Sequence, residues 1–396
     1  MGIAKKVKKQ HSFPFVKVTL FSLLLFLTLF RPFAIIYQQK EAFLTRDYFE
    51  RYGTFKKLYY SSQYVKKDKP SIIPDEILES FAGGAFLQGL NPILIIHDQP
   101  PLGRYIIALS ILLFANAATI IVPLLLLSLV GMYLISYKVI ENVTYALIPV
   151  ALFSNEPLFM NKFIYNPLLE PIQLPFIIFA LYFFILGIEK KKPLKWFILS
   201  SIMLGFVISI RFFVLGAGVV VAMSIFFLLR KKIDKKMITF FISLPLSLVI
   251  LIVSYTKTIQ AGYSLIQVLG IQKYLLVYHK SKFILPFSFW DLLLFNRWHT
   301  WWGDKAIIGD PHWIILWPVV SLVTFIGVIL WIMKKIVISS PEKIILLWVA
   351  VLSFMLSTGY TSTRYFLPLL PFLYILATSF IIKVVKQKNL LPYEKK

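Results

Sequence analysis

Two adjacent carboxylates, Asp75 and Glu76, lie in a polar segment that follows the first long apolar stretch of the chain. The run HDQPPLGR, at residues 97–104, comes later in the same segment and contributes Asp98 and Arg104. A membrane helix does not need adjacent acids for its stability. A carboxylate held beside a substrate can instead accept the proton of an attacking hydroxyl or amine, so this segment is the first candidate for acid–base chemistry.

Isolated cations interrupt apolar sequence elsewhere in the chain. Arg211 lies within ISIRFFVLG and Arg364 within TSTRYFLPLLP, while Lys162 and Glu170 occur in NKFIYNPLLEP. An arginine inside or at the edge of a membrane is costly and is usually paired, which makes each a candidate site residue. Several cations facing carboxylates suit a lipid-linked phosphate that has a reacting group beside it.

The composition indicates where these residues are held. The chain of 396 residues is 58% hydrophobic and 15% charged, with a mean hydropathy of +0.77. Its repeated apolar runs, each of about 18–22 residues, match a hydrocarbon core roughly 30 Å thick. We therefore expect an all-α polytopic membrane protein, folded as one domain over residues 1–396. The net charge of +24 is attributed to lysines that flank helices and face anionic lipid, not to binding of nucleic acid.

Lysine clusters divide the apolar runs, and placing every cluster in the cytoplasm fixes a topology. The chain would cross the membrane about ten times with both termini inside, and long outer loops would cover about 37–116 and 256–312. A helix at 102–115 would lie on the surface or half span the membrane. The predicted crossings are 18–36, 117–137, 143–158, 171–188, 196–210, 213–229, 237–255, 313–333, 344–358 and 364–382.

This orientation places most of the acids at the outer face, together with the isolated cations. The candidate site residues on that face are Asp75, Glu76, Asp98, Arg104, Lys162, Glu170, Arg211 and Arg364. Purely structural explanations remain open for several of them. Asp75 and Glu76 follow Pro74 and could simply open a helix, where acids complement the helix dipole. Arg211 and Arg364 could anchor helices at the interface.

The second outer loop contains NRWHTWWGDKAIIGDPHW at 296–313. Its His299, Asp304, Asp310 and His312 are of metal-ligating type, but their spacing matches no common metal motif, so we predict no metal and no cofactor. Trp298, Trp301 and Trp302 would serve as an interfacial belt or as flat surfaces for a sugar or lipid. The chain has no cysteine, which excludes disulfides, thiol nucleophiles and cysteine-ligated zinc.

An acidic pair in the first outer loop, followed by a PPLG(K/R) motif, resembles the protein O-mannosyltransferase and aminoarabinose-transferase superfamily. These are glycosyltransferases of the GT-C fold that use polyprenyl-phosphate sugars. In that family the motif typically reads Asp-x-His-Pro-Pro-Leu-Gly-Lys. Here Arg104 matches the terminal basic residue, but Gln99 stands in the place of the histidine.

Three further segments resemble the same superfamily, and the likeness extends over residues 15–230 and 340–382. They are SNEPLFMNKFIYNPLLEPIQLPF, GFVISIRFF and RYFLPLLPFLYILA. The resemblance implies a GT-C-like bundle of about 10–11 transmembrane helices with a long first extracytoplasmic loop. It points to Arg211 as a contact of the lipid phosphate and places Glu170 near an acidic position of the family.

The residues and the resemblance together predict inverting sugar transfer at the outer face of the cell membrane. Asp75 would be the general base, Glu76 would orient the acceptor or hold Arg104, and the cations would bind the phosphate. The partners would be a polyprenyl-phosphate-linked sugar, a glycan, lipid or protein acceptor, and the bilayer. Two alternatives stay open: a secondary transporter, which would instead carry charges near the bilayer midplane, and a non-catalytic GT-C relative, which the Gln99 departure favours.

Overall fold

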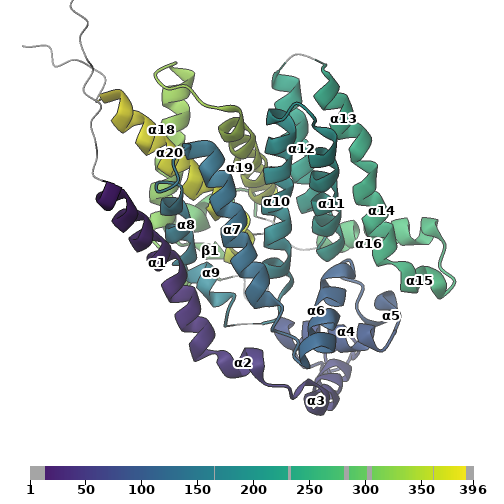
Figure 1. The fold of residues 1–396 in the computed structure, drawn as a ribbon. Coiled ribbons are helices and arrows are strands. Elements are labelled where there is room, and N and C mark those ends of the chain that lie inside the picture. Colours follow the sequence, from purple (N-terminus) through teal and green to yellow (C-terminus); the bar gives the residue numbers. More distant parts are fainter. Residues whose placement is uncertain are drawn as a thin grey trace, which may run out of the picture.

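Long apolar helices, packed side by side, dominate the computed structural model of this chain (Figure 1). It describes residues 14–164, 166–230, 233–280, 285–300, 306–359 and 361–388. Six described helices are long and apolar enough to cross a membrane: 16–38, 121–140, 169–189, 235–254, 340–358 and 370–387. Shorter apolar helices accompany them. The expectation of an all-α polytopic membrane protein is confirmed.

The described elements fall into the helices of the bundle and the segments that connect them. The bundle helices are α1 (Pro14–Gln38), α7 (Ile121–Ile140), α8 (Leu147–Ser154), α10 (Leu169–Glu189), α11 (Leu194–Ile210), α12 (Val214–Leu229), α13 (Lys235–Ser243), α14 (Pro245–Ser254), α18 (Leu316–Ile332), α19 (Ser340–Thr358) and α20 (Leu370–Lys388). The first outer segment forms α2 (Lys40–Leu44), α3 (Tyr48–Tyr60), α4 (Asp75–Leu87), α5 (Pro92–Ile95) and α6 (Leu102–Phe114). The later elements are α9 (Pro157–Asn161), α15 (Thr256–Gln260), α16 (Leu265–Lys280), α17 (Ser288–Phe295), the antiparallel strands β1 (Trp298–His299) and β2 (Ile307–Ile308), and the 3₁₀ helix η1 (Thr363–Phe366).

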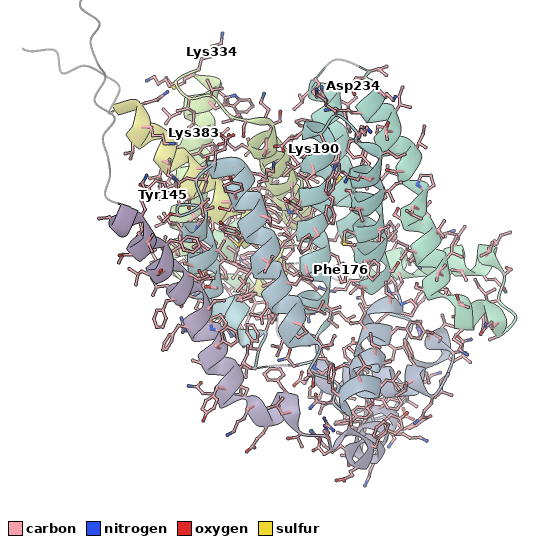
Figure 2. The ribbon with its side chains drawn as sticks, viewed as in Figure 1. Tyr145, Phe176, Lys190, Asp234, Lys334 and Lys383 are labelled. Carbon is pink, nitrogen blue, oxygen red and sulfur yellow. The ribbon has the colours of Figure 1, made fainter. Side chains whose placement is uncertain are left out.

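Three lysines, one from each of three of the clusters, lie at the same end of this bundle. Lys190, Lys334 and Lys383 lie at the top of Figure 2, as does Asp234. Elements α2 to α5 lie at the opposite end (Figure 1). The described parts of the two predicted outer loops are largely helical, and the first of them lies at the end opposite Lys190, Lys334 and Lys383.

Each predicted crossing overlaps a helix, but three differ in form. The predicted helix 143–158 is broken, because α8 ends at Ser154 and α9 begins at Pro157. Glu156 has φ −63° and ψ 127°, the extended conformation that a following proline favours. Helix 237–255 divides at Pro245, which opens α14.

The last predicted helix, 364–382, begins later than expected. Residues 363–366 form the 3₁₀ turn η1, and the α-helix starts at Leu370. Pro368 lies between these two elements, and its missing N–H cannot join a helical ladder. Arg364 therefore lies on a turn at the bundle's edge and not on the last helix.

Helix contacts bring distant segments together around α10 and α11. Helix α10 packs against α7, α11 and α19, and α11 packs against α6 and α14. Gly103 permits one of these approaches, since a Cβ there would lie 2.7 Å from Leu169 Cδ2 and 3.0 Å from Ile210 Cγ2. The glycine of the PPLG motif thus lets α6 lie directly against the start of α10 and the end of α11.

Candidate functional site

Asp75 is the first residue of α4 and contacts the other end of the chain. It follows Pro74, the N-cap residue of the helix, whose backbone is extended. Its place in the first turn also agrees with a purely structural role, in which an acid complements the helix dipole. Its Oδ2 accepts a hydrogen bond of 2.8 Å from Arg364 Nη1. The Asp75 side chain remains 50% exposed, so the carboxylate is open to solvent while it is held by the arginine.

Glu170 joins Arg364 to a second arginine. It lies in the first turn of α10, and its Oε1 is 3.2 Å from Arg211 Nη1 and 3.6 Å from Arg364 Nε. Arg211 directly follows α11 in an extended conformation. The ring of Tyr365 contacts both guanidinium groups, at 5.5 Å from that of Arg211 and 5.4 Å from that of Arg364. These contacts converge from α10, the α11–α12 turn and η1.

Lys162 adds a third cation beside this cluster. It lies in the connector after α9 and is almost fully buried. Burial lowers the pKa of its amine, and the nearby charge of Glu170 partly opposes that shift. Arg211 and Arg364 are close enough to lower the pKa of Lys162 further. The structure thus groups four of the expected site residues, Asp75, Glu170, Arg211 and Arg364, with Lys162 next to them.

A cavity of about 210 Å³ opens beside the arginines. Its polar lining includes Gln99, Glu170, Gln173, Arg211 and Arg364. The rest of its wall is mainly aliphatic and comes from α10, α12 and α19: Leu174, Ile177, Val214, Leu215, Leu352, Met355 and Leu356. A cationic rim joined to an aliphatic wall matches a molecule that has an anionic head and a hydrocarbon tail.

Arg104 and Asp98 belong to a separate, adjacent cluster. The Arg104 side chain is fully buried, and its Nε and Nη2 donate to the two carboxylate oxygens of Glu79 at 2.8 and 3.0 Å. Nη2 also donates to Asp98 Oδ1 at 2.9 Å, and Nη1 to the Ile96 carbonyl at 3.3 Å. Burial raises the pKa of Glu79 to about 6, against the opposing effect of Arg104. Arg104 does not line the cavity and instead joins α4, α6 and the loop between them.

Glu79 is a residue that the sequence reasoning missed, although a signal for it existed. It stands four positions after Asp75, one helical turn further along α4. The expectation that Glu76 would hold Arg104 is replaced by this bidentate Glu79–Arg104 pair. Glu76 is half-buried, and within the described part of the chain its side chain makes no ion pair.

The second predicted outer loop holds Thr363, the neighbour of Arg364, in place. Thr363 Oγ1 donates to Asp310 Oδ2 at 2.7 Å, and His312 donates to the other Asp310 oxygen through its main-chain N–H at 2.8 Å. Although burial raises the pKa of Asp310, hydrogen bonds from His312 and Thr363 lower it more, so the net shift is downward. Asp310 was considered as a metal ligand, and here it fixes the turn that carries Arg364.

The other residues of that loop do not meet at one point. His299 pairs with Asp291 at 2.9 Å, whereas Trp298 Nε1 donates to the Thr361 carbonyl at 2.8 Å. Trp301, Trp302 and Asp304 lie outside the described residues. Across the described ranges, no group of three or more histidine, aspartate or glutamate side chains could hold a metal ion.

This chain is similar to several known proteins in sequence or in fold. Residues 98–259 match the family described as dolichyl-phosphate-mannose-protein mannosyltransferase, a range that contains Gln99, Lys162, Glu170 and Arg211. The structure resembles ArnT from Cupriavidus metallidurans bound to undecaprenyl phosphate, with a TM-score of 0.51 and 14% identity over 85% of this chain. It also matches the archaeal oligosaccharyltransferase AglB from Archaeoglobus fulgidus, in complex with an inhibitory peptide and a dolichol-phosphate, with a TM-score of 0.49 and 11% identity over 76% of this chain.

This chain corresponds to only part of each matched structure. The chain spans 61% of the length of that ArnT chain and 45% of that AglB chain. No curated protein matches the sequence. The fold is that of the GT-C glycosyltransferases, and the resemblance to this superfamily that the sequence indicated is confirmed.

Proposed function

We propose that this membrane protein of GT-C fold transfers a sugar from a polyprenyl-phosphate donor to an acceptor at the extracytoplasmic face, with inversion of the anomeric carbon. The observation that carries the proposal is the cluster of Arg211, Glu170 and Arg364, which stands beside an aliphatic cavity and contacts Asp75. The ArnT structure is bound to undecaprenyl phosphate, a lipid of the class proposed here.

The lipid would bind with its phosphate at the cations and its tail along the aliphatic wall. Arg211 and Arg364 each have a guanidinium group that can donate to phosphate oxygens, while Lys162 adds a positive charge beside them. Glu170 keeps the two arginines close together before the lipid arrives, because it neutralises part of their mutual repulsion. The phosphate is thus met by donors that are already in place.

In the transfer step, Asp75 would accept the proton of an acceptor hydroxyl or amine as that atom attacks C1 of the sugar. The bond between C1 and the phosphate oxygen breaks, and its electron pair leaves with the polyprenyl phosphate. Attack from the face opposite the phosphate inverts C1. The arginines stabilise the second negative charge that develops on the departing phosphate.

The proposed roles of the other residues follow from their positions. Glu76 lies beside the base and would orient the acceptor. Asp98 and Arg104 do not reach the cavity and would hold α4, with Asp75 at its start, in place against α6. The acceptor is a glycan, a lipid or a protein.

A radiolabelled lipid-linked sugar tests the proposal directly. Wild-type protein purified in detergent or nanodiscs should release polyprenyl phosphate and form a glycosylated product whose anomeric configuration, determined by NMR, is inverted. Asp75→Asn should lower the rate by about 10²- to 10⁴-fold, because the base is lost, while the amide oxygen can still accept from Arg364. Asp68→Asn, at an exposed acid of the same outer segment, is the matched control. Full activity of Asp75→Asn would contradict the assignment of the base.

A further inference from the structure

Gln99 is bound at one end of its side-chain amide and open at the other. Its Oε1 accepts a hydrogen bond of 2.8 Å from the main-chain N–H of Phe212. Phe212 lies in the turn between α11 and α12, where N–H groups have no helical partner. A main-chain N–H can only donate, so the amide oxygen must face Phe212 and the NH₂ group of Gln99 points away from it.

Gln99 lies beside the proposed phosphate site. Gln99 lines the same cavity as Arg211, Glu170 and Arg364, and Phe212 is the residue after Arg211. Within the described part of the chain, Gln99 Nε2 has no hydrogen-bond partner from the protein. The preceding residue, Asp98, is fixed by the buried Arg104, so the Gln99 backbone is held from the other side.

A second glutamine on the cavity wall has the opposite arrangement. Gln173 Nε2 donates to the Val207 carbonyl at 2.8 Å, which leaves its Oε1 as the end not bonded to the protein. Gln99 therefore offers both of its N–H donors, whereas one N–H of Gln173 is already used. Phosphate oxygens are acceptors, so of the two amides Gln99 has the larger free donor capacity.

We propose that Gln99 has two functions in donor binding: its Oε1 holds the turn that carries Arg211, and its Nε2 donates a hydrogen bond to a phosphate oxygen of the polyprenyl-phosphate donor. This inference rests on the proposed function. The residue adds a neutral donor to the cationic cluster without adding a charge. A histidine at this position would titrate near pH ~6.5, whereas the amide does not.

Three substitutions separate the two functions. Gln99→Glu keeps an oxygen that can accept from Phe212 but replaces the donor with a negative charge. Gln99→Met removes both interactions without adding a charge. If Gln99 only held the turn and the phosphate bound out of reach of its side chain, Gln99→Glu would match wild type and Gln99→Met would be impaired. The proposed contact with phosphate predicts the reverse order, with Gln99→Glu the weaker binder.

The measured quantities are the affinity for polyprenyl phosphate, by native mass spectrometry in detergent, and KM and kcat with the lipid-linked sugar. We expect Gln99→Met to weaken binding by about tenfold, Gln99→Glu by more than that, and the loss to fall mainly in KM. Gln63→Glu is the matched control, since Gln63 Oε1 also accepts from a main-chain N–H, that of Ile73 at 3.2 Å, away from the cavity. Wild-type affinity of Gln99→Glu would overturn the proposal.

Gln99→His gives an independent readout. A neutral imidazole can accept from Phe212 with one nitrogen and donate to phosphate with the other, so we expect near wild-type binding at alkaline pH. Protonation removes the acceptor and releases the turn. Binding should therefore acquire a dependence on pH near ~6.5 in addition to the one that wild type shows from the second ionisation of the phosphate monoester. A profile that matches wild type would contradict the tether to Phe212.

Failure of this inference can be told apart from failure of the proposed function. Absence of sugar transfer by wild type, with polyprenyl phosphate still bound, would reject the proposed reaction, and the Gln99 variants would then be judged on affinity alone. Active wild type together with an unaffected Gln99→Glu would reject only the role of Gln99.

Discussion

Arg364 Nη1 lies 2.8 Å from Asp75 Oδ2, although 289 positions of sequence separate the two residues. The same guanidinium group reaches Glu170 through Nε at 3.6 Å. One side chain from the turn before the last helix thus contacts both the carboxylate proposed as the base and the carboxylate that bridges the arginines. Because Asp75 uses only Oδ2 in this pair, Oδ1 is the oxygen that can meet an acceptor.

The two arginines should differ in their effects. Arg211→Ala removes one phosphate contact, so we expect affinity for polyprenyl phosphate to fall by about 10- to 100-fold with a smaller change in kcat. Arg364→Ala should lower affinity to a similar extent and also lower kcat, since Asp75 loses its partner. Native mass spectrometry and steady-state kinetics measure the two quantities.

Arg51→Ala is the control for both arginine substitutions, because its exposed side chain contacts Asp47 and the Phe55 ring and does not line the cavity. Equal kinetic defects in Arg211→Ala and Arg364→Ala would show that the contact with Asp75 does not contribute to the chemical step.

The affinity for phosphate should fall at alkaline pH, because Lys162 loses its charge there. Burial favours the neutral amine, so the pKa of Lys162 lies below its ordinary value of 10.5. As the pH rises through that lowered pKa, the cluster loses a positive charge and its affinity for phosphate falls. In Lys162→Arg the charge persists, and the decline should move to higher pH. Titration of polyprenyl phosphate binding between pH 7 and 10 (roughly the range spanned by a lowered lysine pKa) tests this; superimposable wild-type and Lys162→Arg curves would contradict it.

Gly103 should tolerate no side chain. An added Cβ would meet Leu169 Cδ2 at 2.7 Å and Ile210 Cγ2 at 3.0 Å, so Gly103→Ala must push α6 away from α10 and α11. We expect a loss of stability of about 1–3 kcal/mol, together with reduced activity, because Gln99 and Arg104 move with α6.

Gly53→Ala provides the opposite case within a helix. Gly53 lies inside α3, and an added Cβ would have no atom within 4 Å, so alanine should stabilise the protein by about 0.5–1 kcal/mol. Thermal unfolding in detergent compares the two glycines, and a neutral Gly103→Ala would refute the close approach.

Arg104 should matter for stability more than for contact with substrate. Arg104→Met leaves the buried Glu79 carboxylate and Asp98 without their cation, which should cost about 3–5 kcal/mol. The double variant Arg104→Met with Glu79→Met removes the partner as well and should recover part of that loss. The melting temperature in detergent is the readout. A double variant no more stable than the single one would show that unpaired Glu79 is not the source of the cost.

Much of the site could be predicted because charge is rare in this sequence. Asp75, Glu170, Arg211 and Arg364 stand out in apolar or turn contexts, and a topology based on lysine clusters places them on one face. Pairing was harder to predict, because it depends on helix rotation. Glu79 and Glu76 are close in sequence, yet only the geometry of α4 shows that Glu79 faces Arg104.

Two other features differ from what the sequence predicted. Asp310 looks like a metal ligand in sequence, and its bond to Thr363 depends on how the second outer loop packs against η1. Pro157 favours a break after α8, whereas the apolar character of 143–158 favours one continuous helix, which is what the sequence analysis predicted. Hydrophobicity predicts that a segment is buried, but it does not predict where the segment's backbone turns.

The break after α8 has a consequence for how a polar site can exist inside an apolar bundle. Helix α8 has only 8 residues, so at 1.5 Å per residue it ends after about 12 Å, well short of a full crossing. The chain then turns through α9, which lies below α8 in Figure 1, and continues to Lys162. Glu156 closes the turn by accepting from Trp317 and Tyr374, so helices α18 and α20 hold the shortened helix in place. The early end of α8 thus lets the chain bring Lys162 to a buried place near Glu170 and the two arginines, where a continuous helix through 143–158 would have left no connector to carry it.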